Sequence, residues 1–285
     1  MREIMQRKKT QGDKTMFSKR ITSITCLLTL VVFVCVSCVS APVRSGGGQE
    51  RFYKGQRAGV IDILRESREE MLNGNLDRAK TLATEAKEKS ETNKDNVMRL
   101  SCTLWMSMIS MLMKDTKKPV DYSSMDFLKD EDFETLFRGY LLVMYDLNAF
   151  DLKDKRLPGA LLNLSLSDKE LIDKGNLIAD GLRKGGQGRL ADLVEVLFKS
   201  YAGLIKTATD HNSSDVSQYK RKILSASDEI VSLTDNPMMA KEMSSVLKML
   251  ALYLKLIVVG SDRDMETYEK TAKKFAVVFS SLQVM

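Results

Sequence analysis

Helical spacing of apolar residues dominates the chain from about Arg57 to its end, and no other feature constrains the fold as strongly. Only four prolines occur in the 285 residues, and no stretch alternates apolar and polar residues as a half-buried strand would. The pattern therefore predicts an all-α fold. We expect helices over Arg57–Leu72, Leu76–Ser90, Asp95–Met113, Asp130–Leu147, Ser167–Arg183, Arg189–Thr207, Val216–Leu233, Pro237–Val259 and Asp264–Leu282.

Several of these helices have a recognisable start. Ser167 stands three residues before Glu170, the spacing of a capping box that satisfies two otherwise unpaired amide groups. Asn236 precedes Pro237, which places a good N-cap before the one helical position that proline favours. The acidic run 130–132 suits a first turn, where carboxylates complement the helix dipole, better than it suits a metal site.

Two stretches of the chain share one spacing of glycine, apolar and small residues. Gly74 is followed by Leu76, Ala79, Ala83 and Ala86, and Gly188 is followed by Leu190, Leu193, Leu197 and Ser200. In the preceding helices, Ile63 with Ser67 and Leu177 with Gly181 take the large and small packing positions. This arrangement resembles the turn and second helix of a tetratricopeptide (TPR) repeat. The resemblance implies stacked antiparallel helical hairpins, that is, a TPR-like α-solenoid.

Two of the expected helices are apolar on nearly every side. Residues 100–113 carry no charge and include the single tryptophan, Trp105, and residues 246–259 are interrupted only by two lysines. Such helices are either core helices enclosed by their neighbours or walls of a pocket for an apolar ligand. Methionines make the first of them adaptable in shape, and those around Trp105 are Met98, Met106, Met108, Met111 and Met113.

The N-terminal region has the parts of an export signal. Lys19-Arg20 precede the uncharged run Ile21–Cys38, which ends in a cysteine after Ser37. This stretch resembles a bacterial lipoprotein signal, although Cys35 stands where leucine is usual. The resemblance implies that Cys38 receives the lipid and becomes the mature N-terminus. We therefore divide the chain into a signal peptide (1–37), a lipidated cysteine with a flexible tether (38–54) and a helical-repeat domain (55–285).

Two other interpretations of this region remain open. Val39-Ser40-Ala41 is an acceptable cleavage site for the ordinary signal peptidase, which would release a soluble secreted protein. Alternatively, Ile21–Val39 approaches the roughly 20 residues needed to span a bilayer and would stay as an anchor. Translation starts at Met1 or at Met16. Every interpretation exports the C-terminal part, and the lipoprotein one places it in the bacterial cell envelope, facing the periplasm or the surface.

Charge and cysteine content argue against a nucleic-acid-binding protein and against a fold stabilised by disulfides. Residues 1–37 carry seven basic and two acidic side chains, which account for five of the six net positive charges of the chain. The remainder lacks the clustered basic residues of a nucleic-acid-binding protein. After removal of the signal and acylation of Cys38, Cys102 is the only free thiol, so no disulfide can form within the mature chain. We expect Cys102 to be a buried small hydrophobic residue.

The sequence offers no motif for catalysis, metal binding or a cofactor. The only histidine, His211, lies in a polar segment without a second histidine or a cysteine nearby. Residues 185–188 are rich in glycine, but neither a preceding strand nor a following Lys-Ser/Thr makes them a phosphate-binding loop. We therefore expect a protein that is not an enzyme. An envelope hydrolase would instead require a perturbed carboxylate pair in a cleft.

These features lead to two expectations for function. The first is a membrane-tethered scaffold that binds another exported protein or peptide, with Arg68 and Met71 as exposed binding residues on a first helix. The second is a binding protein for a small apolar or carboxylate ligand, with a pocket around Trp105. In organisation the second resembles the repeat-containing lipoprotein partner of some spirochaetal TRAP-type transporters.

Overall fold

The computed structural model describes residues 56–113, 132–149, 151, 152, 154, 156, 167–209, 213–235 and 241–283. Within these ranges the chain forms nine α-helices and no strand, so the all-α prediction is confirmed. The helices are α2 (Gln56–Leu72), α3 (Leu76–Thr92), α4 (Asn96–Leu112), α5 (Phe133–Asp146), α7 (Asp168–Lys184), α8 (Gly188–Thr209), α9 (Ser213–Leu233), α10 (Lys241–Ser261) and α11 (Met265–Gln283).

The capping box predicted at Ser167 is present, whereas the acidic residue 132, predicted in a first turn, is instead the N-cap of α5. Ser167 accepts a hydrogen bond from the backbone N–H of Glu170, and the Glu170 carboxylate accepts one from the backbone N–H of Ser167 at 2.7 Å. Asp132 caps α5 by accepting from the Glu134 N–H. Asn236 and Pro237 lie outside the described residues, as do the other two residues of the acidic run, 130 and 131.

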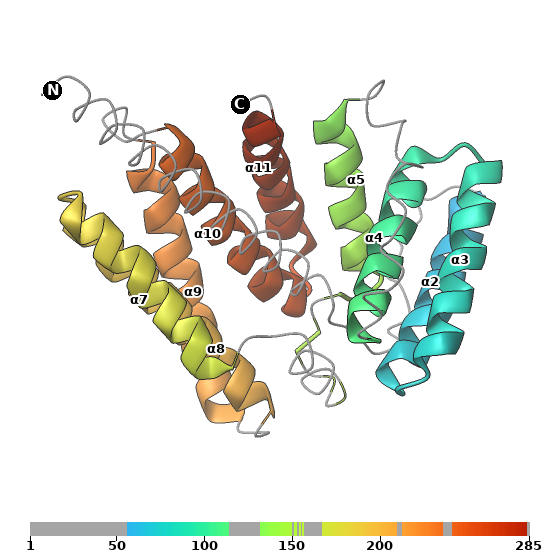
Figure 1. Cartoon of the computed structure of the whole chain (residues 1–285), viewed down its shortest axis with the longest axis horizontal. Coiled ribbons are helices and arrows are strands. Elements are labelled where there is room, and N and C mark those ends of the chain that lie inside the picture. Colours follow the sequence, from blue (N-terminus) through green and yellow to red (C-terminus); the bar gives the residue numbers. More distant parts are fainter. Residues whose placement is uncertain are drawn as a thin grey trace, which may run out of the picture.

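The helices follow one another in space in two runs. In the first run, α2, α3, α4 and α5 each contact the next helix of the chain, and in the second run α7, α8, α9, α10 and α11 do the same. The two runs meet where α5 packs against α11, in the middle of the molecule, so that α2 and α7 lie at opposite ends (Figure 1). Neighbouring helices in space therefore follow the order α2, α3, α4, α5, α11, α10, α9, α8 and α7, so that the second run continues the first in reverse chain order.

Aromatic side chains dominate the junction between α5 and α11. Phe137 stacks on Phe279 with 4.7 Å between ring centroids, and Tyr145 packs against Tyr268 at 4.8 Å. The buried Tyr268 hydroxyl donates a hydrogen bond of 2.8 Å to the carbonyl oxygen of Leu141. These contacts join residues more than 120 positions apart, and together they fix how the second run sits on the first.

Four helix pairs are joined by the same three-residue turn. The turns are Asn73–Asn75, Asn93–Asp95, Gly185–Gln187 and Asp262–Asp264, and their central residues have positive φ: Gly74 (84°), Lys94 (52°), Gly186 (77°) and Arg263 (59°). In each turn the third residue donates its backbone N–H to the carbonyl five positions earlier, and the central residue donates to the carbonyl three positions earlier. This hydrogen-bond pattern closes the end of the first helix and starts the second within three residues.

The structure corrects the register of the second copy of the sequence repeat. Gly74 lies two residues before α3, and the residue in the same place before α8 is Gly186, not Gly188. The predicted packing positions Leu177 and Gly181 are consequently wrong: Leu177 is 74 % exposed, and Gly181 is exposed as well. Because each helical residue turns by about 100°, a shift of two moves a side chain to the opposite face of the helix. The packing face of α7 carries Gly175 and Ala179 instead.

Gly175 allows α7 and α8 to approach closely. A Cβ atom at this position would lie 2.6 Å from both Cβ and Cγ of Phe198 on α8, whereas one at Gly181 on the same helix would have no neighbour within 4 Å. The contact at Gly175 involves the stem of the Phe198 side chain, which cannot move without its helix. The pair therefore offers a matched test of how α7 and α8 pack.

We expect Gly175→Ala to lower the free energy of unfolding by about 1–3 kcal/mol, the usual range for overpacking, partly offset by the better helix propensity of alanine. Gly181→Ala should instead raise it by up to about 1 kcal/mol, because only the propensity term acts there. Urea unfolding followed by circular dichroism measures both. Equal effects of the two substitutions would contradict the close approach at Gly175.

Helices α4 and α10 are largely buried. In α4 the side chains of Met98, Cys102, Trp105, Met108 and Ile109 are fully buried. In α10, Met243–Ser261 is long and apolar enough to cross a membrane by length and composition alone, yet 78 % of its most apolar stretch is buried inside the protein. Both helices are therefore enclosed by their neighbours, as one of the two sequence interpretations predicts.

Candidate functional site

The three binding residues predicted in the helical domain, Arg68, Met71 and Trp105, are all buried. Arg68 and Met71, which we expected to be exposed, each have only 3 % of their surface accessible, so that expectation is wrong. Both continue the buried face of α2 that starts at Val60 and Leu64, because residues three and four positions apart share one side of a helix. The lipidation residue Cys38 and the histidine His211 lie outside the described residues.

Trp105 is completely buried and its polar atom is satisfied. The indole N–H donates to Ser67 Oγ on α2 at 3.0 Å, and the Ser67 hydroxyl donates in turn to the carbonyl oxygen of Ala79 on α3 at 2.7 Å. This chain of hydrogen bonds links α4, α2 and α3. Of the methionines expected around Trp105, Met98 and Met108 are buried in the same core and Met106 and Met113 pack against it, while nothing is described of the Met111 side chain.

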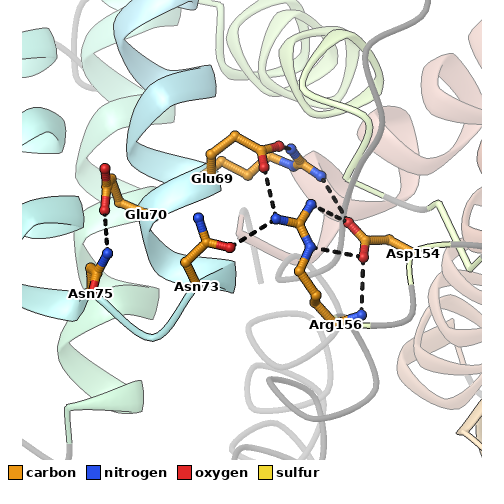
Figure 2. Close-up of polar contacts among 7 residues, drawn as sticks. Glu69, Glu70, Asn73, Asn75, Asp154 and Arg156 are labelled. Atoms are coloured by element: carbon orange, nitrogen blue, oxygen red, sulfur yellow. Dashed lines mark hydrogen bonds and ion pairs between the residues drawn. The ribbon is translucent and has the colours of Figure 1, made fainter.

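A cluster of charged side chains surrounds the C-terminal end of α2. Arg156 donates from Nη1 to Glu69 Oε2 and to Asn73 Oδ1, both at 3.0 Å. It also binds the carboxylate of Asp154 through two hydrogen bonds, from Nε at 3.1 Å and from Nη2 at 2.8 Å. Figure 2 shows Arg156 lying between Asp154 on one side and Glu69 and Asn73 on the other. These hydrogen bonds raise the pKa of Arg156 above its ordinary value, that with Asp154 most strongly.

Arg68 is the most deeply buried member of this cluster. Its Nη1 donates to the Glu69 carboxylate, while its Nη2 lies 3.9 Å from Asp154 Oδ2, too far for a hydrogen bond. Within the described part of the chain, Nε and Nη2 of Arg68 have no hydrogen-bond partner. Leaving a buried polar group unpaired costs about 1–3 kcal/mol, and more when the group is charged.

The electrostatics of Arg68 agree with this geometry. Burial lowers its pKa to about 10, and this effect exceeds the opposing influence of Glu69 and Asp154. The Arg68 charge is therefore only partly compensated by its two neighbouring carboxylates. Arg156 adds a second positive charge close by, which also lowers the pKa of Arg68. Sequence reasoning singled out Arg68 but missed Asp154 and Arg156, because no spacing rule connects residues more than 80 positions apart.

The remaining reactive groups have ordinary structural roles. Cys102 is fully buried, as predicted, and burial raises the pKa of its thiol to about 12. A thiol with so high a pKa carries almost no thiolate near neutral pH and is a poor nucleophile. In the ranges that the structure describes, no group of three or more His, Cys, Asp or Glu side chains is placed to hold a metal ion.

Comparison with known proteins yields no match among protein-family models, curated proteins or solved structures.

Proposed function

We propose that the protein is a bacterial lipoprotein whose TPR-like helical repeats form a non-enzymatic scaffold, held at a membrane through Cys38, for another exported protein or peptide. The observation that supports this proposal most directly is the use of one turn geometry at four places in the helical domain. Repeated helical hairpins build extended surfaces, and repeat proteins of this kind bind proteins and peptides on them.

The arrangement of the helices is compatible with a solenoid made in two parts. Within each run every helix contacts its neighbour in the chain, as in stacked hairpins. The contact between α5 and α11 then joins the two runs at their C-terminal ends. The end helices α2 and α7 each present an outer face of mostly charged side chains to solvent, the usual property of terminal repeats.

The binding surface has to be placed elsewhere than on Arg68 and Met71, because both are buried. In the described part of the chain all exposed large apolar side chains belong to the second run; they are Leu177, Val196, Leu233, Met243 and Val277. Partner proteins bury apolar side chains at the centres of their interfaces. We therefore assign the docking surface to the run α7–α11, with Leu177 on α7 as its most exposed apolar member.

Site-specific photo-cross-linking tests the scaffold. A photoreactive amino acid replaces Leu177 or Val196 in the full-length protein, and Thr81 or Glu85 on the exposed side of α3 in control variants. After irradiation of native envelopes, we expect one adduct of discrete mass from the two positions in the second run and none from the controls. Failure of every position to form an adduct would count against a scaffold, and equal adducts from both runs would indicate non-specific contact.

A further inference from the structure

Among the described residues, no acceptor pairs with one complete edge of the Arg68 guanidinium. Nε–H and Nη2–H of an arginine point in the same direction and form a two-pronged fork, and these are the two unpaired atoms of Arg68 within the described residues. The hydrogen bond of the guanidinium that the described residues show is on its other side, from Nη1 to Glu69. The side chain itself is 96 % buried, so bulk water does not hydrate the fork.

We propose that this edge of Arg68 binds the carboxylate group of a ligand. The two oxygens of a carboxylate are spaced to accept one hydrogen bond each from Nε and Nη2, which is the strongest pairing that an arginine forms. The Asp154 carboxylate lies 3.9 Å from Arg68 Nη2 and already accepts hydrogen bonds from the Arg156 side chain. It therefore leaves Nε and Nη2 of Arg68 without an acceptor among the described residues.

The charges around Arg68 favour a carboxylate over a phosphate. Among the described residues, Glu69 and Asp154 are the carboxylates paired with Arg68 and Arg156, and a ligand with one negative charge would add a third. A doubly charged phosphate would meet stronger repulsion from the two resident carboxylates. A singly charged, planar carboxylate is therefore the better match.

The cluster reaches the surface on one side. The side chains of Glu69 and Arg156 are 42 % and 39 % exposed, whereas Arg68 and Asp154 behind them are almost fully buried. Because Nε and Nη2 of Arg68 have almost no accessible surface, a ligand carboxylate would reach them only when a covering side chain such as Glu69 or Arg156 moves aside. This proposal does not depend on the membrane tether or on a docked partner protein, since it uses only side chains of α2 and of residues 154 and 156.

Acetate is the probe that tests the site. The full-length protein, kept in mild detergent and labelled with ¹⁵N-arginine, is titrated with potassium acetate and, separately, with potassium chloride at equal ionic strength. We expect the Nε–H signal of Arg68 to shift saturably with acetate and not with chloride. An equal response to both salts would overturn the proposal and leave a buried water, or no acceptor at all, on the fork.

Two substitutions on α2 give a matched comparison. Arg68→Lys keeps the positive charge but removes the fork, and it should weaken acetate binding about tenfold or more in calorimetry. Arg65→Lys changes an exposed arginine on the same helix, paired only with Asp62, and should leave binding unchanged. Unaltered acetate affinity in a folded Arg68→Lys protein would overturn the proposal. If that variant does not fold, the titration of the unaltered protein decides alone.

A peptide with a free C-terminal carboxylate and its amidated form identify the source of the ligand. Tighter binding of the free-acid peptide than of acetate would indicate that a peptide supplies the carboxylate, and binding of acetate alone would indicate a small organic acid. Both outcomes retain the carboxylate site. The photo-cross-linking experiment probes the run α7–α11, at the other end of the molecule, so the two proposals can fail separately (Figure 1).

Discussion

Replacing Trp105 by alanine is expected to lower the free energy of unfolding by about 3–5 kcal/mol, the range for removing a fully buried large aromatic side chain. Trp105 has no accessible surface, and its indole N–H is hydrogen-bonded to Ser67. The substitution removes the packing contacts of the indole ring and the hydrogen bond that links α4 to α2. Such a loss is a large fraction of the 5–15 kcal/mol that is typical of folded domains.

Trp105→Phe separates packing from hydrogen bonding. Phenylalanine keeps an aromatic ring in the core but gives no N–H to Ser67, and it should cost clearly less than alanine does. Ser67→Ala leaves the buried indole N–H unpaired and should cost about 1–3 kcal/mol. Urea unfolding followed by far-ultraviolet circular dichroism measures the stability of all three variants. Tryptophan fluorescence would not serve, because two of the variants lack the single tryptophan. A loss below 1 kcal/mol for Trp105→Ala would contradict its position in the core.

Local signals were sufficient to predict the helices. Eight of the nine helix starts and all nine helix ends in the described ranges lie within three residues of the prediction, and the ninth start, that of α10, follows residues that the structure does not describe. The reason is that the signals themselves are local, such as the capping box at Ser167 and the glycine before α3. Burial of Cys102 also followed from its uncharged surroundings.

The register of the second repeat failed because three glycines stand close together. Gly185, Gly186 and Gly188 all suit a turn, and only the observed backbone shows that Gly186 has the positive φ. In α8 the error had no consequence, because Leu190, Leu193 and Leu197 are buried in any case between α7 and α9. Among the described helices, α7 packs mainly against α8, so the same error exchanged its buried face for its exposed one.

Arg68 illustrates a different limit of sequence reasoning. Its position on a first helix of a repeat suggested exposure, but its spacing from Leu64 and Met71 places it on the buried face of α2. The periodic pattern could have shown this burial. Nothing in the pattern could have shown that Asp154 and Arg156 lie beside Arg68, or that α5 packs against α11, because helical periodicity identifies a buried face without naming the helix that covers it.

Replacing Cys38 by alanine is expected to abolish incorporation of labelled fatty acid and to stop processing at this position. Cys38 lies outside the described residues, and its assignment rests on the apolar run that ends at it and on the basic pair Lys19-Arg20. The Cys38 thiol is the proposed acceptor of the lipid, and the methyl side chain of alanine has no group that can take its place. The helical domain should fold unchanged in this variant, since its first described helix begins only at Gln56.

Cys35→Ala is the matched control, because Cys35 stands in the same apolar run only three residues earlier. This variant should be labelled and processed like the unaltered protein. Each buried CH₂ contributes only about 0.8 kcal/mol to membrane binding, so stable attachment needs more than one acyl chain. The acylated cysteine of a bacterial lipoprotein would supply these chains, so loss of Cys38 should remove all of them together. A Cys38→Ala protein that still takes up fatty acid would exclude the lipoprotein assignment. If neither the parent nor the variant is labelled, the apolar run acts as a membrane anchor or as a cleaved secretion signal, and fractionation of the envelope distinguishes these two.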